Sequence, residues 1–547
     1  MPILDGLIRR LRLPEFLRDH LPTEDRRCRI PTATTLLILV QNLLLCREPL
    51  YGVGQWAARH VPQRRGLAPE QLPAFNEDRV GRCLDRLFDA DIPSLSLAVV
   101  THMVREFGVE LDQLHNDSTT ITFHGEYEHA DRERSLRGQL RLAVTHGHNK
   151  DHRPNLKQLL YILTVTRDGA VPVPFRVQSG NTTDDRSHIA TWELLRRLTG
   201  HSDFLDVADC KLATAENRAH RHRHGGRFVS VLPRTRAEDT AFRARVRDGH
   251  ARWSHLHDKR DEQGEVVDRF SVHEPEHTSA EGYRLIWYHS VVKAEHDALT
   301  RHRRLERALG PLAALRQKLA SPRTRYRERA QVAQAVEAIL HDGQVEGWIT
   351  VAITEETITT FRQKRRGRPN GDTPYVKHER KRFDLTSHLD HARLAEEAHG
   401  DGIFPLITND LTLRALDLLL AYKQQPRIEK RFAQLKTDFV VAAVFLKEVS
   451  RIQALLCVSF FVLLVESLLE RELRQAMARE GIDSLPLYPE GRACRLPTAC
   501  RVIELFEEVQ RHELRSGQHP PVVFATELTR LQRRILRLLG MPHAYEG

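Results

Sequence analysis

From residue 111 to residue 235, a series of β-rich segments gives way to alternating helix and strand patterns, and this order restricts the possible folds. Three β-rich runs come first: LDQLHNDSTTITFHGEY, LKQLLYILTVTRDG and AVPVPFRVQSGN. The last two runs meet at Asp168-Gly169, and because Asp-Gly is typical of tight hairpin turns, they predict antiparallel strands. Helix and strand patterns then alternate: SHIATWELLRRLTG, FLDVADCK, ENRAHRHRH and RFVSVLP. The order predicts an α/β fold with a mixed sheet covered by helices.

The rest of the chain divides around this stretch. A chain of 547 residues is too long for one compact core, so several domains are expected. We predict a helical region at 1–110, a core at 111–235 and 401–470, an insertion at 236–400, and a helical C-terminal region at 471–547 that is a candidate for dimerisation. The insertion is predicted to be β-rich, with charged helices at 294–340. Pro426 should break or kink the helical segment that contains it.

Composition restricts the class of protein. Lys and Arg number 83 against 73 Asp and Glu, a net charge of +10 that permits a polyanionic partner. The seven cysteines contain no C-x-x-C pair, which favours reduced thiols in a cytoplasmic protein. The longest apolar run, ALLCVSFFVLLV at 454–465, is too short to span a bilayer and predicts a buried helix. No membrane partner is expected.

Two aspartates fall in strand-like contexts. Asp117 lies in the first β-rich run, and Asp209 ends the apolar run FLDVAD. Ligands of open α/β sheets bind at strand ends, which favours a functional role for Asp209. Asp206 is its rival in the same strand, but alternation of side chains places it on the opposite face. A structural role for Asp117 stays open at this stage.

Glu429 lies in the basic helical segment YKQQPRIEKRFAQLK. Tyr422, Glu429 and Lys436 are spaced seven residues apart, which is close to two helical turns, so Glu429 and Lys436 share a face. A carboxylate for a metal and a lysine for a phosphate on one face suit a nuclease. The alternative is a solvated helix with salt bridges.

This ordered set resembles the DDE-type bacterial insertion-sequence transposases, which have a ribonuclease H-like core. One branch carries its third carboxylate in Y-x2-R-x3-E-x6-K, and Tyr422, Glu429 and Lys436 match that spacing. Gln425 stands at the arginine position, so the arginine is either lost or supplied by Arg427. Three further stretches resemble a sub-branch: GHNKDHRPNLKQLLYILTVTRDGAVPVPFRVQSGNTTD, DVADCKLATAEN and DGIFPLITND.

The resemblance implies a function. Asp117, Asp209 and Glu429 would ligate two Mg²⁺ or Mn²⁺ ions, ions that accept carboxylate ligands. The enzyme would cut and join double-stranded DNA at the terminal inverted repeats of its own mobile element and insert it into target DNA, as a homodimer. A β-rich insertion between the second and third carboxylates is also a feature of the branch. A nuclease or resolvase without strand transfer and an inactive DNA-binding descendant are the alternatives.

Several residues are candidates for contacting DNA: Tyr422, Arg427, Lys436 and Trp287. Trp287 would stack on an extruded base, although a tryptophan in an apolar strand is more often core. The helical region 1–110 is expected to recognise the element ends, with a structural bundle as the alternative. Asn181 and Asp184 suit a turn as well as a site. The histidine-rich run at 220–224 predicts a solvated helix end rather than a metal site.

Overall fold

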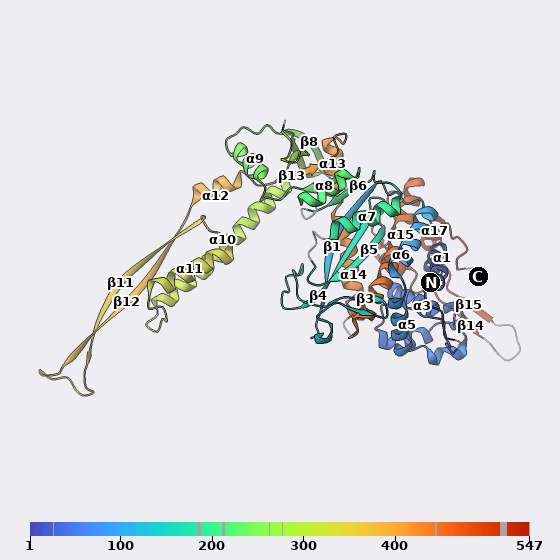
Figure 1. Ribbon diagram of the computed structural model, residues 1–547, viewed down its shortest axis with the longest axis horizontal. Helices are drawn as coiled ribbons and strands as arrows, with labels where there is room; N and C mark the ends of the chain where they lie inside the picture. The colour runs from blue at the N-terminus through green and yellow to red at the C-terminus, as the bar shows by residue number, and fades with distance from the viewer. Residues whose placement is uncertain are drawn as a thin grey trace. The chain divides into compact units, whose positions relative to one another are not determined.

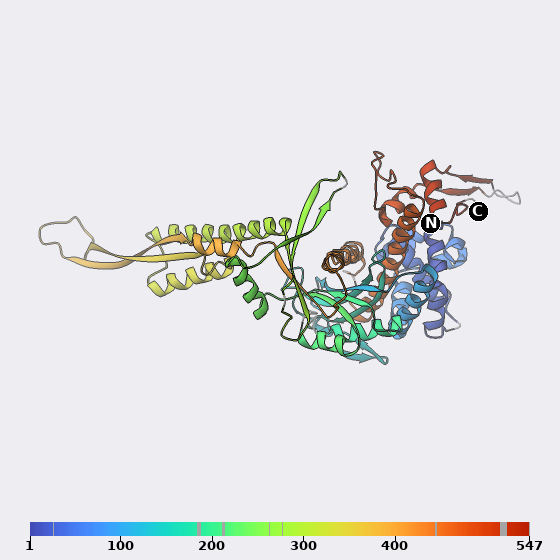
Figure 2. The same ribbon diagram turned by 90° about the horizontal axis from the view of Figure 1, so that it is seen from above.

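The computed structural model describes the chain except residues 26, 183–186, 210–213, 262, 276, 444–445, 515–521 and 546–547. Two compact units result (Figures 1 and 2). The first comprises Met1–Ser230, Thr408–Leu413 and Asp417–Gly547, and the second comprises Val231–Ile407 and Arg414–Leu416. The residues that the sequence assigns to an insertion therefore lie in the second unit.

A mixed sheet organises the first unit. Its strands are β1 (Gln113–Phe123), β4 (Lys157–Thr166), β5 (Pro172–Ser179), β6 (Leu205–Ala208) and β7 (Arg227–Val231). They are ordered β5-β4-β1-β6-β7. The pairs β1–β4 and β4–β5 are antiparallel, whereas β6 is parallel to both β1 and β7. The prediction of a mixed α/β sheet is confirmed.

The predicted hairpin joins β4 to β5. Gly169 adopts a positive φ of 80°, which the turn requires and glycine tolerates without strain. The Thr166 amide donates to the Val171 carbonyl at 3.0 Å and closes the turn. Two helices, α7 (Ser187–Thr199) and α8 (Ala215–Arg223), alternate with β6 and β7, as the sequence pattern indicates. Along the chain, β1 is followed by a short hairpin of β2 (Arg134–Leu136) and β3 (Gln139–Arg141), and β4 comes after it.

The N-terminal region is helical, as predicted. Its α-helices are α1 (Pro2–Arg10), α2 (Leu13–His20), α3 (Thr32–Leu45), α4 (Val53–Ala58), α5 (Glu77–Asp89) and α6 (Ile92–Phe107). The mainly apolar α3 and the amphipathic α5 pack against α15 (Val449–Arg479). Arg451 of α15 bonds Asp85 of α5 at 3.0 and 2.8 Å. The N-terminal helices therefore share one hydrophobic core with a helix from the far end of the chain.

A fragment of residues 1–110 is expected to be unfolded or aggregated, because without α15 it exposes the apolar sides of α3 and α5. Circular dichroism and gel filtration of the fragment, with the full chain as control, check this. A monomeric fragment with a cooperative melting transition would contradict the shared core. Recognition of the element ends by this region is better tested in the full chain.

Helix α15 contains the apolar run that the sequence predicts to be buried. It is long and apolar enough to cross a membrane by composition, but 94% of its most apolar window is buried inside the protein. Two bent helix pairs within 32–107 also pass that compositional test. Burial inside the protein confirms the prediction of a buried helix at 454–465.

The helices around Pro426 show why the predicted break occurs there. Helix α13 (Ala415–Lys423) ends before it, and α14 (Pro426–Ala443) begins at it. Proline is favoured at the first helical position, because its missing N–H has no partner there in any case. After α15 come α16 (Ala499–Leu505), β14 (Arg511–Leu514), β15 (Val522–Ala525) and α17 (Arg530–Leu538). The expectation of an all-helical C-terminal region is wrong at the β14–β15 pair.

The second unit is mixed rather than β-rich, which corrects the prediction. Its strands are β8 (Ser254–Arg260), β9 (Val266–His273), β10 (Arg284–Ser290), β11 (Ile349–Gln363), β12 (Tyr375–Leu389) and β13 (Ile403–Thr408). Its helices are α9 (Ala237–Arg247), α10 (Val291–Ala320), α11 (Arg329–Gly343) and α12 (His391–Ala398). Helix α10 forms because Ala308, Leu312, Leu315 and Leu319 recur every three or four residues and make a stripe that is buried against α11 and β12.

Candidate active site

Asp117 and Asp209 meet at one point of the sheet in the first unit. Strands β1 and β6 are parallel, with Asn116 opposite Ala208 as their last paired residues. The next residue on β1 is Asp117, and the next after β6 is Asp209. Because neighbouring strands lie roughly 4.8 Å apart, the two carboxylates project from adjacent backbones. The Ser230 hydroxyl fixes the backbone here by donating to the Asp209 carbonyl at 2.5 Å.

Electrostatics distinguish Asp117 from an ordinary surface aspartate. Burial raises the pKa of Asp117, the Lys150 ammonium opposes the rise, and the Asp209 charge adds to it. Lys150 donates to Asp117 Oδ1 at 3.2 Å and to the Ser118 hydroxyl at 2.8 Å. A half-buried carboxylate whose pKa is raised beside a second carboxylate is typical of a site built for a cation.

The surroundings of Asp206 exclude it as the second carboxylate of the site. Its Oδ2 accepts from Arg221 Nε at 2.6 Å, and the side chains are 1% and 0% exposed. A carboxylate sealed in a buried ion pair supports the fold and is not accessible to a substrate. The alternation of strand faces predicted this separation from Asp209.

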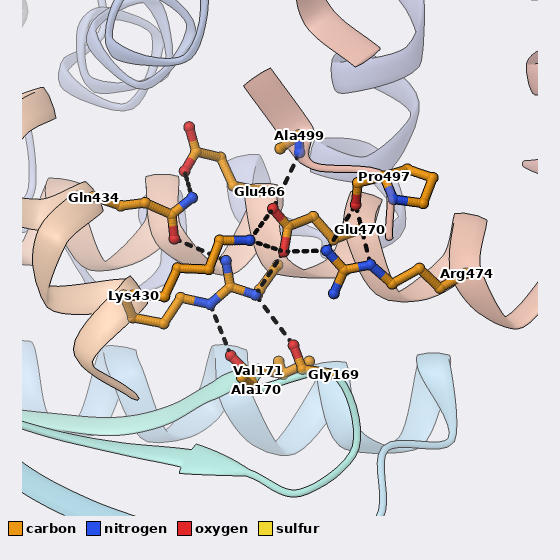
Figure 3. A network of polar contacts seen from close by, with 12 residues as sticks. Gly169, Ala170, Val171, Lys430, Gln434, Glu466, Glu470, Arg474, Pro497 and Ala499 are labelled. Atoms are coloured by element: carbon orange, nitrogen blue, oxygen red, sulfur yellow. Dashed lines mark hydrogen bonds and ion pairs between the residues drawn. The ribbon is translucent and has the colours of Figure 1, made fainter. Parts of the chain in front are cut away.

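Helix α14 carries Glu429 and is held in a fixed rotation by a buried network. Figure 3 shows side chains of α14 and α15 converging on Glu470, which is 1% exposed. Arg431 and Lys430 bond its carboxylate at 3.1 and 3.3 Å. Arg431 also donates to the Ala170 carbonyl at 3.0 Å, which ties α14 to the β4–β5 turn. One side of α14 is therefore bonded to α15 and to the β4–β5 turn.

The other side of α14 runs along β1. At its start, Gln425 Nε2 donates to the Asn116 carbonyl at 3.1 Å. Three turns on, Lys436 Nζ bonds Asp151 at 2.5 Å, and Asp151 is the neighbour of the lysine that bonds Asp117. Glu429 is exposed and falls between these two contacts. At about 100° per residue, Glu429 and Lys436 are separated by roughly 20° around the helix, so they share this face.

Gln425 explains the departure from the arginine of the motif. It is nearly buried, and its Oε1 lies 3.0 Å from Nδ1 of His115. Burial lowers the pKa of His115 to about 4, so the ring is neutral near pH 7. A neutral amide satisfies this pocket, whereas an arginine would add a buried charge beside Arg427. Arg427 itself donates to the Arg167 carbonyl at 2.9 Å, near the start of β1, and does not occupy the same place.

The structure places two further residues that were predicted to contact DNA, Tyr422 and Trp287, differently from the prediction. Tyr422 belongs to α13, and because the helix breaks before Pro426, the seven-residue spacing does not place it on the face of Glu429. Trp287 is 2% exposed and stacks on Phe242 with ring centroids 3.9 Å apart. The prediction that Trp287 meets an extruded base is wrong, because its ring is core of the second unit. Asp184 lies outside the described residues.

Two features were missed or undervalued from the sequence. Lys150 lies in HGHNKDHR, which indicated only a basic, flexible segment, yet its ammonium bonds Asp117. Glu193, His220 and His224 place ligand atoms within 4.8 Å of one another, a spacing that the sequence alone did not indicate. Glu193 also pairs with Arg196 at 2.8 Å, and a cation there competes with a metal ion.

The donor set at the sheet suits one class of ion. Asp117, Asp209 and Glu429 offer carboxylate oxygens, which Mg²⁺ and Mn²⁺ prefer over soft metals. Asp117 is half-buried, whereas Glu429 on α14 is exposed to solvent. Lys150, which bonds Asp117, and Lys436, which bonds Asp151, add positive charge of the kind that binds phosphate.

Comparison with known proteins adds a partial match. A family model described as a domain of unknown function (DUF4277) matches residues 1–101. No curated protein matches the chain. Among solved structures, the chain is similar to a piggyBac transposase in a synaptic complex with hairpin DNA, with 7% identity and a TM-score of 0.26, covering 85% of this chain and 78% of that one. A TM-score this low carries no argument, so function rests on the residues of the chain itself.

Proposed function

We propose that the chain is a DNA transposase that cuts and joins double-stranded DNA at the ends of its own mobile element. The observation that supports this most is the parallel register of β1 and β6, which sets Asp117 beside Asp209. The strand order β5-β4-β1-β6-β7, three antiparallel strands followed by two parallel ones, supports the proposal of a ribonuclease H-like core. The DDE resemblance of the motifs points to the same conclusion.

In this proposal each residue has a distinct task. Asp117, Asp209 and Glu429 would hold two divalent ions, whose chemistry when bound would be to activate the nucleophile and to stabilise charge on the leaving oxygen. Lys150 balances the charge of Asp117 and is placed to contact a DNA phosphate that binds there. Lys436 positions backbone phosphate, exchanging its bond with Asp151 for one with DNA. Gln425 and the Glu470 network fix the helix that carries Glu429.

The test uses a plasmid that carries the coding region together with its flanking DNA. The purified full chain should nick or excise that segment in Mg²⁺ or Mn²⁺ and not in a chelator. With precut ends it should join them to a second, target plasmid. Cleavage without joining would indicate a nuclease or resolvase instead. Binding without cleavage under any metal would indicate an inactive DNA-binding descendant.

A further inference from the structure

A long two-stranded arm is the most unusual surface of the second unit. Strands β11 and β12 pair over their whole length, from Ile349 opposite Leu389 to Gln363 opposite Tyr375. Fifteen residues per strand at about 3.3 Å each give a ribbon roughly 50 Å long. Both views show the ribbon lying beside α10 and α11 and continuing past them (Figures 1 and 2). Residues 357–382 form the distal part, called the arm below.

The base of the ribbon is fixed to the helices. Ile349, Phe383 and Leu385 are buried in a core with α10 and α11. Arg316 of α10 donates from Nε and Nη2 to the two carboxylate oxygens of Asp384, at 2.8 and 2.9 Å. Beyond Phe383 no side chain of the arm is buried. The arm is thus attached at one end, and it presents a two-stranded ribbon to solvent.

The arm concentrates the positive charge of the chain. Residues 357–382 contain nine Lys and Arg against two Asp and Glu, a net of +7, while the whole chain carries +10. All nine except Arg380 are exposed. In the part of the chain that the structure describes, the five cations nearest the tip form no ion pair: Arg362, Lys364, Arg365, Arg366 and Arg368. Unbalanced charge of this density predicts a polyanionic partner.

Two aromatic rings accompany the charge. Phe361 and Tyr375 are 64% and 53% exposed. Phe361 is opposite Lys377, and Gln363 is opposite Tyr375, so both rings lie on the same face as diagonal neighbours. A pair of exposed rings beside unpaired cations matches a nucleic acid, whose bases and sugars offer apolar faces between phosphates.

We propose that the arm lies in a groove of double-stranded DNA, with the tip cations on phosphates and Phe361 and Tyr375 against sugars or bases. The inference rests on the proposed function and assigns it a DNA-binding surface. The major groove of B-DNA admits a two-stranded ribbon of this kind. A second copy of the chain is the competing occupant of the free strand edges, but two arms of +7 each repel one another.

The experiment compares three full-length variants in binding to duplex DNA of unrelated sequence at several salt concentrations. Lys364→Ser, Arg365→Ser and Arg366→Ser together should lower the slope of log affinity against log salt by about three units. The matched control, Arg479→Ser, Arg530→Ser and Arg533→Ser, removes the same charge from exposed helical positions and should keep the slope. Phe361→Ala with Tyr375→Ala should weaken binding without changing the slope, because an apolar contact releases no counterions.

The outcomes separate this inference from the proposed function. A slope that falls equally in the tip variant and in the control overturns the arm as a DNA contact. So does an unchanged slope combined with a change in oligomeric state, which would assign the arm to a second copy. In either case, metal-dependent cleavage by the wild type leaves the proposed function standing. A wild type that binds no duplex DNA overturns both.

Discussion

Replacing Asp117, Asp209 or Glu429 by alanine, one at a time, should abolish metal-dependent cleavage while DNA binding stays largely intact. Each carboxylate is proposed to hold an ion that stabilises charge in the transition state, a contribution of several kcal/mol. A loss of about 4 kcal/mol slows cleavage by roughly a thousandfold. The measurement is single-turnover cleavage of the plasmid with its flanking DNA, in Mg²⁺ and in Mn²⁺, beside a binding titration in a chelator.

Two controls make this result specific. Glu110→Ala removes an exposed carboxylate just before β1 that bonds Arg167 at 3.0 Å, and it should cleave like the wild type. Asp206→Ala should lose activity only through unfolding, because it leaves Arg221 buried without its partner. An Asp209→Ala variant that cleaves normally would show that the second carboxylate has been assigned to the wrong residue.

Glu470→Ala should cause a large loss of stability. The substitution leaves Arg431, whose side chain is 2% exposed, without its buried counter-charge. Removing one partner of a buried pair typically costs about 3–5 kcal/mol, because the remaining charge is uncompensated. Urea unfolding followed by circular dichroism measures the difference. Glu480→Ala, at an exposed position after the end of α15, is the matched control and should change stability by less than about 0.5 kcal/mol.

The contribution of Glu470 also has a defined pH dependence. Burial acts to raise the pKa of Glu470, but Arg431, Lys430 and Arg474 together hold it below the ordinary value of 4.5. A carboxyl whose folded pKa is lowered stabilises the protein above its unfolded pKa and loses that contribution as pH falls through the folded pKa. The gap in stability between wild type and Glu470→Gln should therefore shrink below about pH 4.5. A gap that grows in acid would contradict the network.

Cleavage activity should also depend on the Glu470 network, although Glu470 is not one of the proposed metal ligands. Lys430 and Arg431 directly follow Glu429 in the sequence, so loosening α14 from α15 would move Glu429, the proposed third carboxylate, relative to Asp117 and Asp209. Glu470→Ala is expected to cleave more slowly even at temperatures where it stays folded. A folded variant with normal cleavage would show that α14 is held by its apolar face alone, through Ile428, Phe432 and Leu435.

Local chemistry let the sequence determine much of the scaffold. Asp168-Gly169 predicted the β4–β5 turn because glycine tolerates positive φ, and Pro426 predicted the break between α13 and α14 because it lacks an N–H. The apolar run at 454–465 predicted a buried helix through its hydrophobicity alone. Side-chain alternation separated Asp206 from Asp209, and the buried pair with Arg221 fits that separation.

Only the tertiary structure decided which residues meet. The pairing of Asn116 with Ala208, which sets Asp117 beside Asp209, depends on a strand register between segments about 90 residues apart in the chain, and no local propensity encodes it. The contact of Gln425 with His115, the bond of Lys150 to Asp117 and the stacking of Trp287 on Phe242 are equally non-local. An apolar tryptophan suits a core and a stacked base alike, because both bury its ring; packing alone chose between them.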